Sequence, residues 1–213
     1  SSRPECFGVG YPFVTPSDMS GRKWASKTER YLSPAGASLL KNNLLPEGSV
    51  AVSCIGWQMG KVILISRPSV TNQQLNSIIL HEGFDSSFLY YALLPWRNTL
   101  LSIGSAAGVR TPIINKSQFS DMRLSVPELA IQRKIAAFLS AYDDLIENNT
   151  RRIEILEEMA RSLYREWFVS FRFPSYEKVE MVDSSIGKVP QGWQVSTISE
   201  FADYYRGCSY RSE

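Results

Sequence analysis

The sequence predicts a mixed α/β (α+β) domain over residues 1–126, followed by one long coiled-coil-type α-helix over residues 127–168. Residues 127–168 contain no glycine and a single proline at the first position, where proline suits a helix start. Apolar or small residues recur along the same stretch in alternating steps of four and three. Residues 1–126 instead combine short apolar runs with turns rich in glycine and proline, which is typical of strands joined by loops.

The elements of the N-terminal part follow from these runs and turns. Apolar stretches of four to six residues predict strands, and Asp and Ser ahead of an apolar stretch predict a capped helix. In chain order we expect a strand at 11–15, a basic loop at 19–30, a short helix within 34–45, strands at 50–54 and 61–66 around a hairpin loop at 55–60, a strand at 75–80, a helix at 88–96, a small-residue loop at 102–108, an extended segment at 109–115 and a strand at 123–126.

The long helix has a heptad seam held over more than four heptads. At about 1.5 Å per residue the helix is roughly 60 Å long, which favours a spacer that pairs with another long helix. The alternative is an amphipathic helix packed on its own domain. One polar residue, Asn149, lies in the seam, where such a residue fixes register. The seam residues are Ile135, Leu139, Tyr142, Ile146, Asn149, Ile153, Leu156, Ala160 and Leu163, and the same spacing continues to Trp167.

Charge and composition narrow the function classes. The net charge is +2, but residues 1–126 hold 12 Lys and Arg against 7 Asp and Glu, while residues 127–168 hold 6 against 8. A basic domain favours an anionic partner such as nucleic acid. No apolar run approaches 18 residues, so no membrane partner is expected. Three scattered cysteines are typical of a reducing, cytoplasmic compartment, and the absence of an initiator Met suggests a fragment or a processed form.

Catalytic and metal-binding patterns are missing from the sequence. His81 is the single histidine and follows an apolar strand, where a structural or surface role is the expected one. No nucleophile–His–carboxylate set can be assembled from it, and no cluster has metal-ligand spacing. The acidic residues Asp143, Asp144 and Glu147 are expected on a solvated or partner-facing side of the helix. We therefore predict no catalytic residue, no metal and no cofactor on this chain.

Three stretches carry a family resemblance. All three lie within 127–168, and they read P-E-L-A-I-Q-R-K-I-A, D-D-L-I-E-N-N and L-E-E-M-A-R-S-L-Y-R-E-W-F. They resemble the central conserved region of type I restriction–modification specificity subunits. Shorter marks of that family precede and follow them: G-Y-P-F-V, L-P-E-G-S-V, T-N-Q-Q-L, G-S-A-A-G-V-R-T-P-I-I-N and V-P-Q-G-W. The resemblance implies a target recognition domain at 1–126 that lacks its opening segment, a spacer helix at 127–168, a linker at 169–189, and at 190–213 the start of a second recognition domain or a segment that completes one.

The resemblance also implies a function and partners. Such a subunit recognises a short double-stranded DNA sequence, and its helix fixes the spacing between two half-sites. Methyltransferase (M) subunits and restriction (R) subunits carry out adenine methylation and cleavage with S-adenosylmethionine, Mg²⁺ and ATP. The aromatic residues Tyr164, Trp167 and Phe168 are expected to anchor an M subunit. A homodimer through the long helix would complete a half-length subunit. The alternatives are the recognition part of a fused restriction–methyltransferase enzyme, and a coiled-coil assembly protein without a DNA role.

Candidate DNA contacts lie on loops that combine cations, amides and aromatic rings. Arg and Lys suit guanine and phosphate, and Gln suits adenine. For the first loop the alternative is ordinary solvated surface, and for the second it is a core position for Trp57. The candidates are Arg22, Lys23, Trp24, Lys27 and Arg30 in the first loop, Trp57, Gln58 and Lys61 in the second, and Arg110, Lys116, Arg206 and Arg211 elsewhere.

Overall fold

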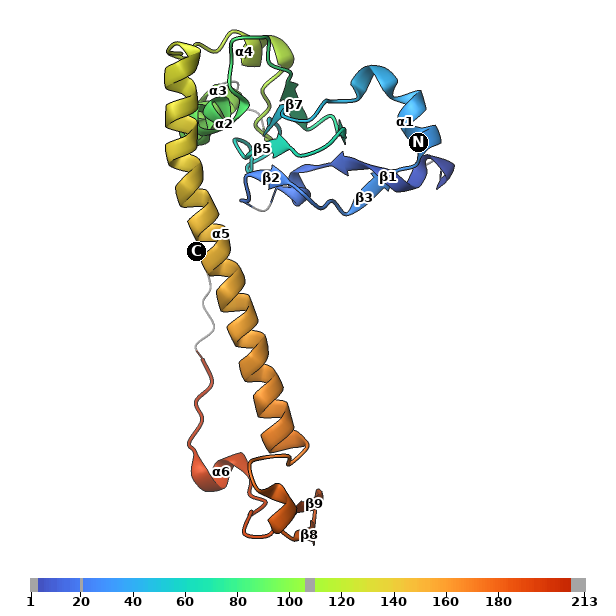
Figure 1. Cartoon of the computed structure of the whole chain (residues 1–213), viewed down its shortest axis with the longest axis vertical. Coiled ribbons are helices and arrows are strands. Elements are labelled where there is room, and N and C mark those ends of the chain that lie inside the picture. Colours follow the sequence, from blue (N-terminus) through green and yellow to red (C-terminus); the bar gives the residue numbers. More distant parts are fainter. Residues whose placement is uncertain (1–3, 20, 106–109, 208–213) are drawn as a thin grey trace. The chain divides into compact units, whose positions relative to one another are not determined.

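The computed structural model describes residues 4–19, 21–105 and 110–207 (Figure 1). Its contacts divide the chain into an N-terminal unit, residues 1–147, and a C-terminal unit, residues 148–213. One helix, α5 (Leu129–Tyr164), belongs to both, because the division falls within it. The two units are described separately below.

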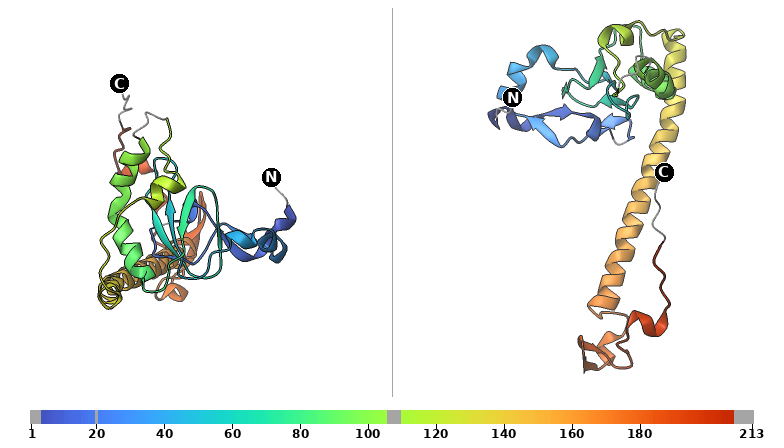
Figure 2. Two further views of the ribbon diagram at one scale, coloured as in Figure 1. Left: turned by 90° about the horizontal axis from the view of Figure 1, so that it is seen from above. Right: turned by 180° about the vertical axis from the view of Figure 1, so that it is seen from behind.

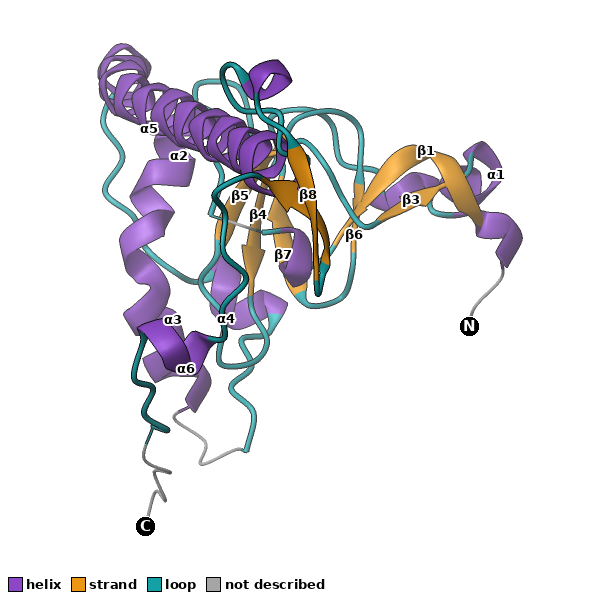
Figure 3. Cartoon of the chain, turned by 90° about the horizontal axis from the view of Figure 1, so that it is seen from below, coloured by secondary structure: helices purple, strands orange, loops and turns teal. Residues whose placement is uncertain are grey.

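The N-terminal unit contains two small sheets. The first has the strand order β3-β1-β6, and the second has the order β2-β5-β4-β7. Helices α2 and α3 lie together on one side of the second sheet (Figures 2 and 3). The elements are β1 (Phe7–Val14), β2 (Trp24–Ala25), β3 (Arg30–Leu32), α1 (Pro34–Leu39), β4 (Val50–Ser53), β5 (Val62–Ile65), β6 (Val70–Thr71), β7 (Leu75–Ile78), α2 (Ser86–Leu93), α3 (Arg97–Ser105) and α4 (Lys116–Ser120), with 3-10 turns at Pro4–Cys6, Pro16–Asp18, Lys41–Asn43 and Leu94–Trp96.

Both faces of the central strands β4 and β5 are buried, which explains why each strand is an almost continuous apolar run. On one face Val52 and Leu64 pack into a core with residues of α2 and α3 such as Tyr90 and Leu100. On the other face alternate residues such as Ile63 pack with residues of β1 and β7. Each fully buried aliphatic side chain contributes roughly 1.5–3 kcal/mol by leaving water. The sheet is therefore the rigid base from which the loops at its ends project.

Helix starts in this unit are fixed by side-chain caps. The carboxylate of Asp85 accepts a hydrogen bond from the backbone N–H of Phe88 at 2.8 Å, which confirms the predicted cap of α2. The hydroxyl of Ser33 caps α1 in the same way, by accepting from the N–H of Gly36 at 3.1 Å. The side chain of Asn115 caps α4. The chain between α4 and α5 then leads directly to the long helix.

Helix α5 confirms the predicted long helix. It contains 36 residues, and a π-helical turn at Arg165–Val169 continues it. Its buried residues are Gln132 and Ala136, both in its first third, where the helix packs on the N-terminal unit. The expected alternative of packing on its own domain therefore holds for the first part of the helix. Beyond Asp143, which is half-buried, the residues of α5 are exposed in the described chain.

The C-terminal unit folds around aromatic side chains. The ring of Trp193 lies 5.9 Å from that of Phe168, 5.3 Å from that of Phe171 and 6.3 Å from that of Phe173. A hairpin of β8 (Met181–Ser184) and β9 (Gly187–Pro190) precedes Trp193, within the stretch for which the sequence predicts a linker. A 3-10 turn at Tyr176–Lys178 and the short helix α6 (Ile198–Phe201) complete the described elements of this unit.

Several local predictions are wrong. The expected loop at 19–30 contains β2 and the first residue of β3, because Trp24 and Ala25 pair with β5 and Ala25 is buried. Residues 102–105 are helical, as the end of α3, since Leu100 and Gly104 pack inward. The expected strand at 123–126 is absent, and no sheet partner lies beside it in the described residues.

Candidate nucleic-acid interface

Three loops meet at one end of the four-stranded sheet. Strands β2 and β5 are parallel, with Trp24 opposite Leu64, so the residues just before each strand share an end of the sheet. Strand β4 runs antiparallel to both β5 and β7, which places the loop 54–61 and the turn 72–74 at that same end. The backbone N–H of Cys54 donates to the carbonyl oxygen of Gln74 at 2.9 Å and joins the last two loops. We call this area the sheet-end surface: residues 22–23, 54–61 and 72–74.

The loop 54–61 presents Trp57 and Gln58 to solvent. The side chain of Trp57 is 65% exposed, so the alternative of a core tryptophan is wrong. The loop is held from behind, because the N–H of Gly56 donates to the carbonyl oxygen of Pro112 at 2.8 Å. The guanidinium of Arg97 donates to the carbonyl oxygen of Trp57 at 3.5 Å. An exposed aromatic ring beside an amide and a cation is suited to contact with bases and phosphate.

Gly60 fixes the end of this loop, and its replacement by alanine is expected to destabilise the unit. Its φ is +84°, and an added Cβ would lie 2.7 Å from the Cα of Arg97. The unfavourable φ costs about 1 kcal/mol or more, and the overlap with backbone adds about 1–3 kcal/mol. We therefore expect urea unfolding of Gly60→Ala to show a loss of about 2–4 kcal/mol in the free energy of unfolding.

Gly56→Ala is the matched control for that measurement. Gly56 has a φ of +85° but nothing within 4 Å of an added Cβ, so only the backbone strain applies. We expect it to lose about 1 kcal/mol. Equal losses for the two variants would show that the approach of Arg97 to Gly60 does not shape the loop.

The turn before β7 adds amide side chains to the surface. The side-chain oxygen of Asn72 accepts from the N–H of Gln74 at 3.1 Å, and its amide donates to the side chain of Gln74 at 3.0 Å. Both residues line a polar hollow together with Arg30 and with the carboxylates of Asp18 and Glu29. Gln73 between them is exposed. Amides and a guanidinium are the groups that pair with adenine and guanine edges in the major groove.

Lys23 lies at this surface but points toward the helices. Its ammonium donates to the hydroxyl of Ser140 on α5 at 2.6 Å and lies 4.8 Å from the ring centre of Tyr91 on α2. Burial lowers the pKa of Lys23, and the carboxylate of Asp143 opposes that shift. Burial and a hydrogen bond to Asp143 raise the pKa of Tyr91. Asp143 thus lies within the domain contact, so its expected place on a solvated or partner-facing side is wrong.

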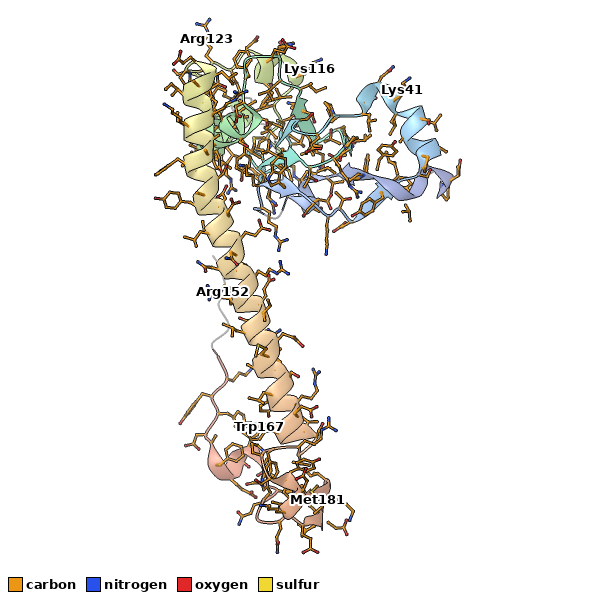
Figure 4. The ribbon with its side chains drawn as sticks, viewed as in Figure 1. Lys41, Lys116, Arg123, Arg152, Trp167 and Met181 are labelled. Atoms are coloured by element: carbon orange, nitrogen blue, oxygen red, sulfur yellow. The ribbon has the colours of Figure 1, made fainter. Side chains whose placement is uncertain are left out.

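The remaining predicted contacts lie in different places. Arg22 is exposed at the sheet-end surface, and Lys61 is half-buried there. Trp24 is exposed on β2, where it pairs with Leu64 away from that end. Lys27 is exposed and follows β2. Arg110 is exposed and lies three residues before Ile113, which pairs with Ile55 of the loop 54–61. Figure 4 shows Lys116 at the start of α4, near the beginning of α5. Arg206 is exposed in the C-terminal unit, and Arg211 lies outside the described residues.

The predicted helix seam is largely exposed. Tyr142, Ile153, Leu156 and Leu163 are each about half exposed or more, so the apolar surface that the heptads predict is present on α5. A second row of apolar residues, missed in the sequence, flanks the seam. Its members are Ile131, Phe138 and Leu145 at seven-residue intervals and, after the charged Arg152 interrupts the row, Met159. An apolar stripe of this width is typical of a helix that is covered by more than one neighbour.

The aromatic end of the helix has contacts inside its own unit. The ring of Phe168 stacks on that of Tyr164, with centres 5.0 Å apart, and Phe168 also contacts Trp193. Trp167 is half-buried in the π-helical turn (Figure 4). Tyr164 and Phe168 remain half-exposed, so they present an aromatic surface.

Sequence reasoning missed Arg97 and the amides of 72–74. The sequence contained a sign of each. Gly60 marks the close backbone approach of Arg97, and Thr71–Gln74 is a polar run between two strands. Within the described residues, no group of three or more His, Cys, Asp or Glu side chains is arranged to hold a metal ion. In the same part of the chain, no helix is both long and apolar enough to cross a membrane.

The fold is that of type I specificity subunits. The S subunit of the type I restriction–modification system from M. genitalium superposes with a TM-score of 0.56 at 18% identity, covering 79% of this chain and 41% of that one. A chain from a study of complex assembly and conformational transition in the type I R-M system superposes with a TM-score of 0.55 at 17% identity, over 76% of this chain and 39% of that one.

Sequence comparison agrees with the fold. The family model "Type I restriction modification DNA specificity domain" matches residues 1–158, and the chain belongs to this family. The specificity subunit of the Methanocaldococcus jannaschii enzyme MjaIX is 28% identical over 198 residues, 92% of this chain and 46% of the relative. That of Haemophilus influenzae HindI is 33% identical over 153 residues, 69% of this chain and 33% of the relative. The chain spans at most about half the length of these curated relatives.

Proposed function

We propose that this chain is the DNA-recognition part of a type I restriction–modification complex. It binds a short sequence in double-stranded DNA and performs no chemistry itself. The observation that carries the proposal is the sheet-end surface, where loops bring exposed Arg22, Trp57 and Gln58 to one end of a rigid sheet. Family membership supports the same function.

Each part of the surface has a chemistry suited to DNA. Arg22 and Arg97 are cations that attract phosphate, and Gln58 and Gln73 are exposed amides that fit adenine edges. Trp57 is a flat apolar surface at the tip of a loop held by backbone hydrogen bonds. Lys27, Arg30, Lys61, Arg110 and Lys116 are further cations of the domain, and Arg206 and Arg211 belong to the C-terminal segment.

Partner subunits supply the chemistry in this proposal. M subunits, with S-adenosylmethionine, methylate adenine, and R subunits, with Mg²⁺ and ATP, cleave DNA. The exposed apolar row beside the seam and the half-exposed Tyr164 and Phe168 support docking of an M subunit on the helix. The described chain offers no grouping of ligands for a metal of its own.

A second copy of the chain completes the subunit. The exposed seam of α5 supports helix pairing between two copies. Residues 190–213 then complete a recognition domain. A strictly monomeric species in light scattering at working concentrations would contradict this arrangement.

The deciding experiment is DNA binding across a salt series, with and without the M subunit. We expect affinity to fall steeply with salt, because Lys and Arg release counterions from phosphate, and sequence preference to appear when the M subunit is added. Helix-mediated association without DNA binding under any condition would identify the chain as an assembly protein instead.

A further inference from the structure

A polar cluster joins three elements of the N-terminal unit at one point. The backbone carbonyl of Lys23 accepts a hydrogen bond from the N–H of Leu64 at 2.8 Å, which fixes Lys23 to strand β5. Its ammonium reaches across to Ser140 on α5 at 2.6 Å. The hydroxyl of Tyr91 on α2 donates to the carboxylate of Asp143 on α5 at 2.6 Å. The ammonium of Lys23 lies 4.8 Å from the ring centre of Tyr91 and closes the cluster.

A second anchor holds the start of the same helix. The side chain of Gln132 is 2% exposed, and its oxygen accepts from the backbone N–H of Asp85 at 2.9 Å. Its amide donates to the carbonyl oxygen of Pro127 at 2.8 Å. Asp85 caps α2, so Gln132 joins α5 to the beginning of α2. Ser140 and Asp143 join α5 to the end of α2, because both are hydrogen-bonded to the hydroxyl of Tyr91.

Two anchors fix a direction where one anchor fixes only a point. Gln132, Ala136, Ser140 and Asp143 follow each other at steps of four, four and three, so they lie on one face of α5. Gln132 and Ser140 are eight residues apart, which is about 12 Å along a helix. A helix held at both points can neither slide nor rotate on the domain without breaking these part-buried hydrogen bonds.

We propose that Lys23 is a positioning residue that, with Tyr91, Ser140 and Asp143, sets the direction of the long helix relative to the DNA-recognition domain, and that it is not itself a phosphate contact. The part of this inference that concerns DNA rests on the proposed function. The adjacent Arg22 is exposed and makes the phosphate contact, whereas the ammonium of Lys23 donates a hydrogen bond to Ser140 on the helix. The direction of the helix determines the spacing between the half-sites that two domains bind.

The first test compares Lys23→Met with Arg22→Met in the complex of the chain with its M subunit. Loss of one phosphate contact lowers the slope of log K against log salt by about 0.9. We expect that decrease for Arg22→Met and no decrease for Lys23→Met. On DNA in which two half-sites are separated by a varied number of base pairs, Lys23→Met and Ser140→Ala are expected to broaden the preferred spacing, while Arg22→Met leaves it unchanged. A slope decrease of about 0.9 for Lys23→Met would overturn the proposal.

The second test does not involve DNA. Spin labels at Lys41→Cys and Glu147→Cys, in a chain whose Cys6 and Cys208 are replaced by Ser, report the distance between the domain and its helix. We expect Lys23→Met and Ser140→Ala to broaden the distance distribution, and the double variant to add little to either, because both disrupt one contact. Distributions as narrow as that of the parent would overturn the proposal. Broadened distributions without any DNA binding would uphold the positioning role and refute the proposed function.

Discussion

Replacement of Gln132 by alanine is expected to lower the free energy of unfolding of the N-terminal unit by about 3 kcal/mol. Gln132 is almost fully buried, and its side chain bonds to the backbone of Asp85, Pro127 and, at 3.4 Å, Gly83. Alanine removes the partner of the half-buried N–H of Asp85 and of the half-buried carbonyl of Pro127, and each buried group left unsatisfied costs about 1–3 kcal/mol. The cap of α2 loosens as well, because Asp85 is the residue that Gln132 holds.

Urea unfolding followed by circular dichroism measures this loss. Arg133→Ala is the matched control, because Arg133 is the next residue on the same helix and is exposed. We expect a change of at most about 0.5 kcal/mol for the control. A loss below about 1 kcal/mol for Gln132→Ala would show that water replaces the lost hydrogen bonds and that Gln132 is not an anchor.

Replacement of Ile153 by glutamate is expected to weaken helix pairing by about 100-fold. Ile153 is a seam residue in the second half of α5 and is 57% exposed in the single chain. Pairing of two helices would bury it, and a carboxylate in that position loses its hydration without a partner. A loss of about 3 kcal/mol corresponds to a factor of about 100 in the dissociation constant. Sedimentation equilibrium over a concentration series measures the change.

Ile155→Glu is the control for the seam. It makes the same substitution at a residue of the same helix that is also about half exposed but lies outside the seam. Its dissociation constant is expected to stay within a few-fold of that of the parent. Equal weakening by both variants would indicate that added charge, and not the seam, controls association. A parent chain that stays monomeric throughout would refute pairing itself.

The sequence allowed the fold to be predicted where one principle dominated. The heptad spacing and the absence of glycine predicted α5 to within a few residues, and the apolar runs predicted β4, β5 and β7. Predictions were wrong where tertiary contacts determined the secondary structure of a segment. Trp24 and Ala25 form a strand of two residues only because β5 lies beside them. Residues 102–105 continue a helix because Gly104 packs against Met59, although their small side chains resemble those of a loop.

The candidate interface was predicted residue by residue but not as a surface. The cations and aromatic rings of the loops were visible in the sequence, whereas the parallel pairing of β2 with β5 that brings two loops together was not. Lys23 shows the limit most clearly. Its position in a basic loop predicts a DNA contact, and only the approach of Ser140, 117 residues later, indicates another role.

The distribution of buried residues along α5 has a consequence for the thermal behaviour of the protein. Burial is confined to the first third of the helix, while the core of the N-terminal unit belongs to one chain. Long exposed helices are only marginally stable in water without packing. If two copies pair through α5 as proposed, heating is expected to give two transitions. One is independent of protein concentration, for the sheet core, and the midpoint of the other rises with concentration, because a second molecule would stabilise that part of the helix by mass action. Dilution alone would then melt the exposed part of α5 while the N-terminal unit stays folded.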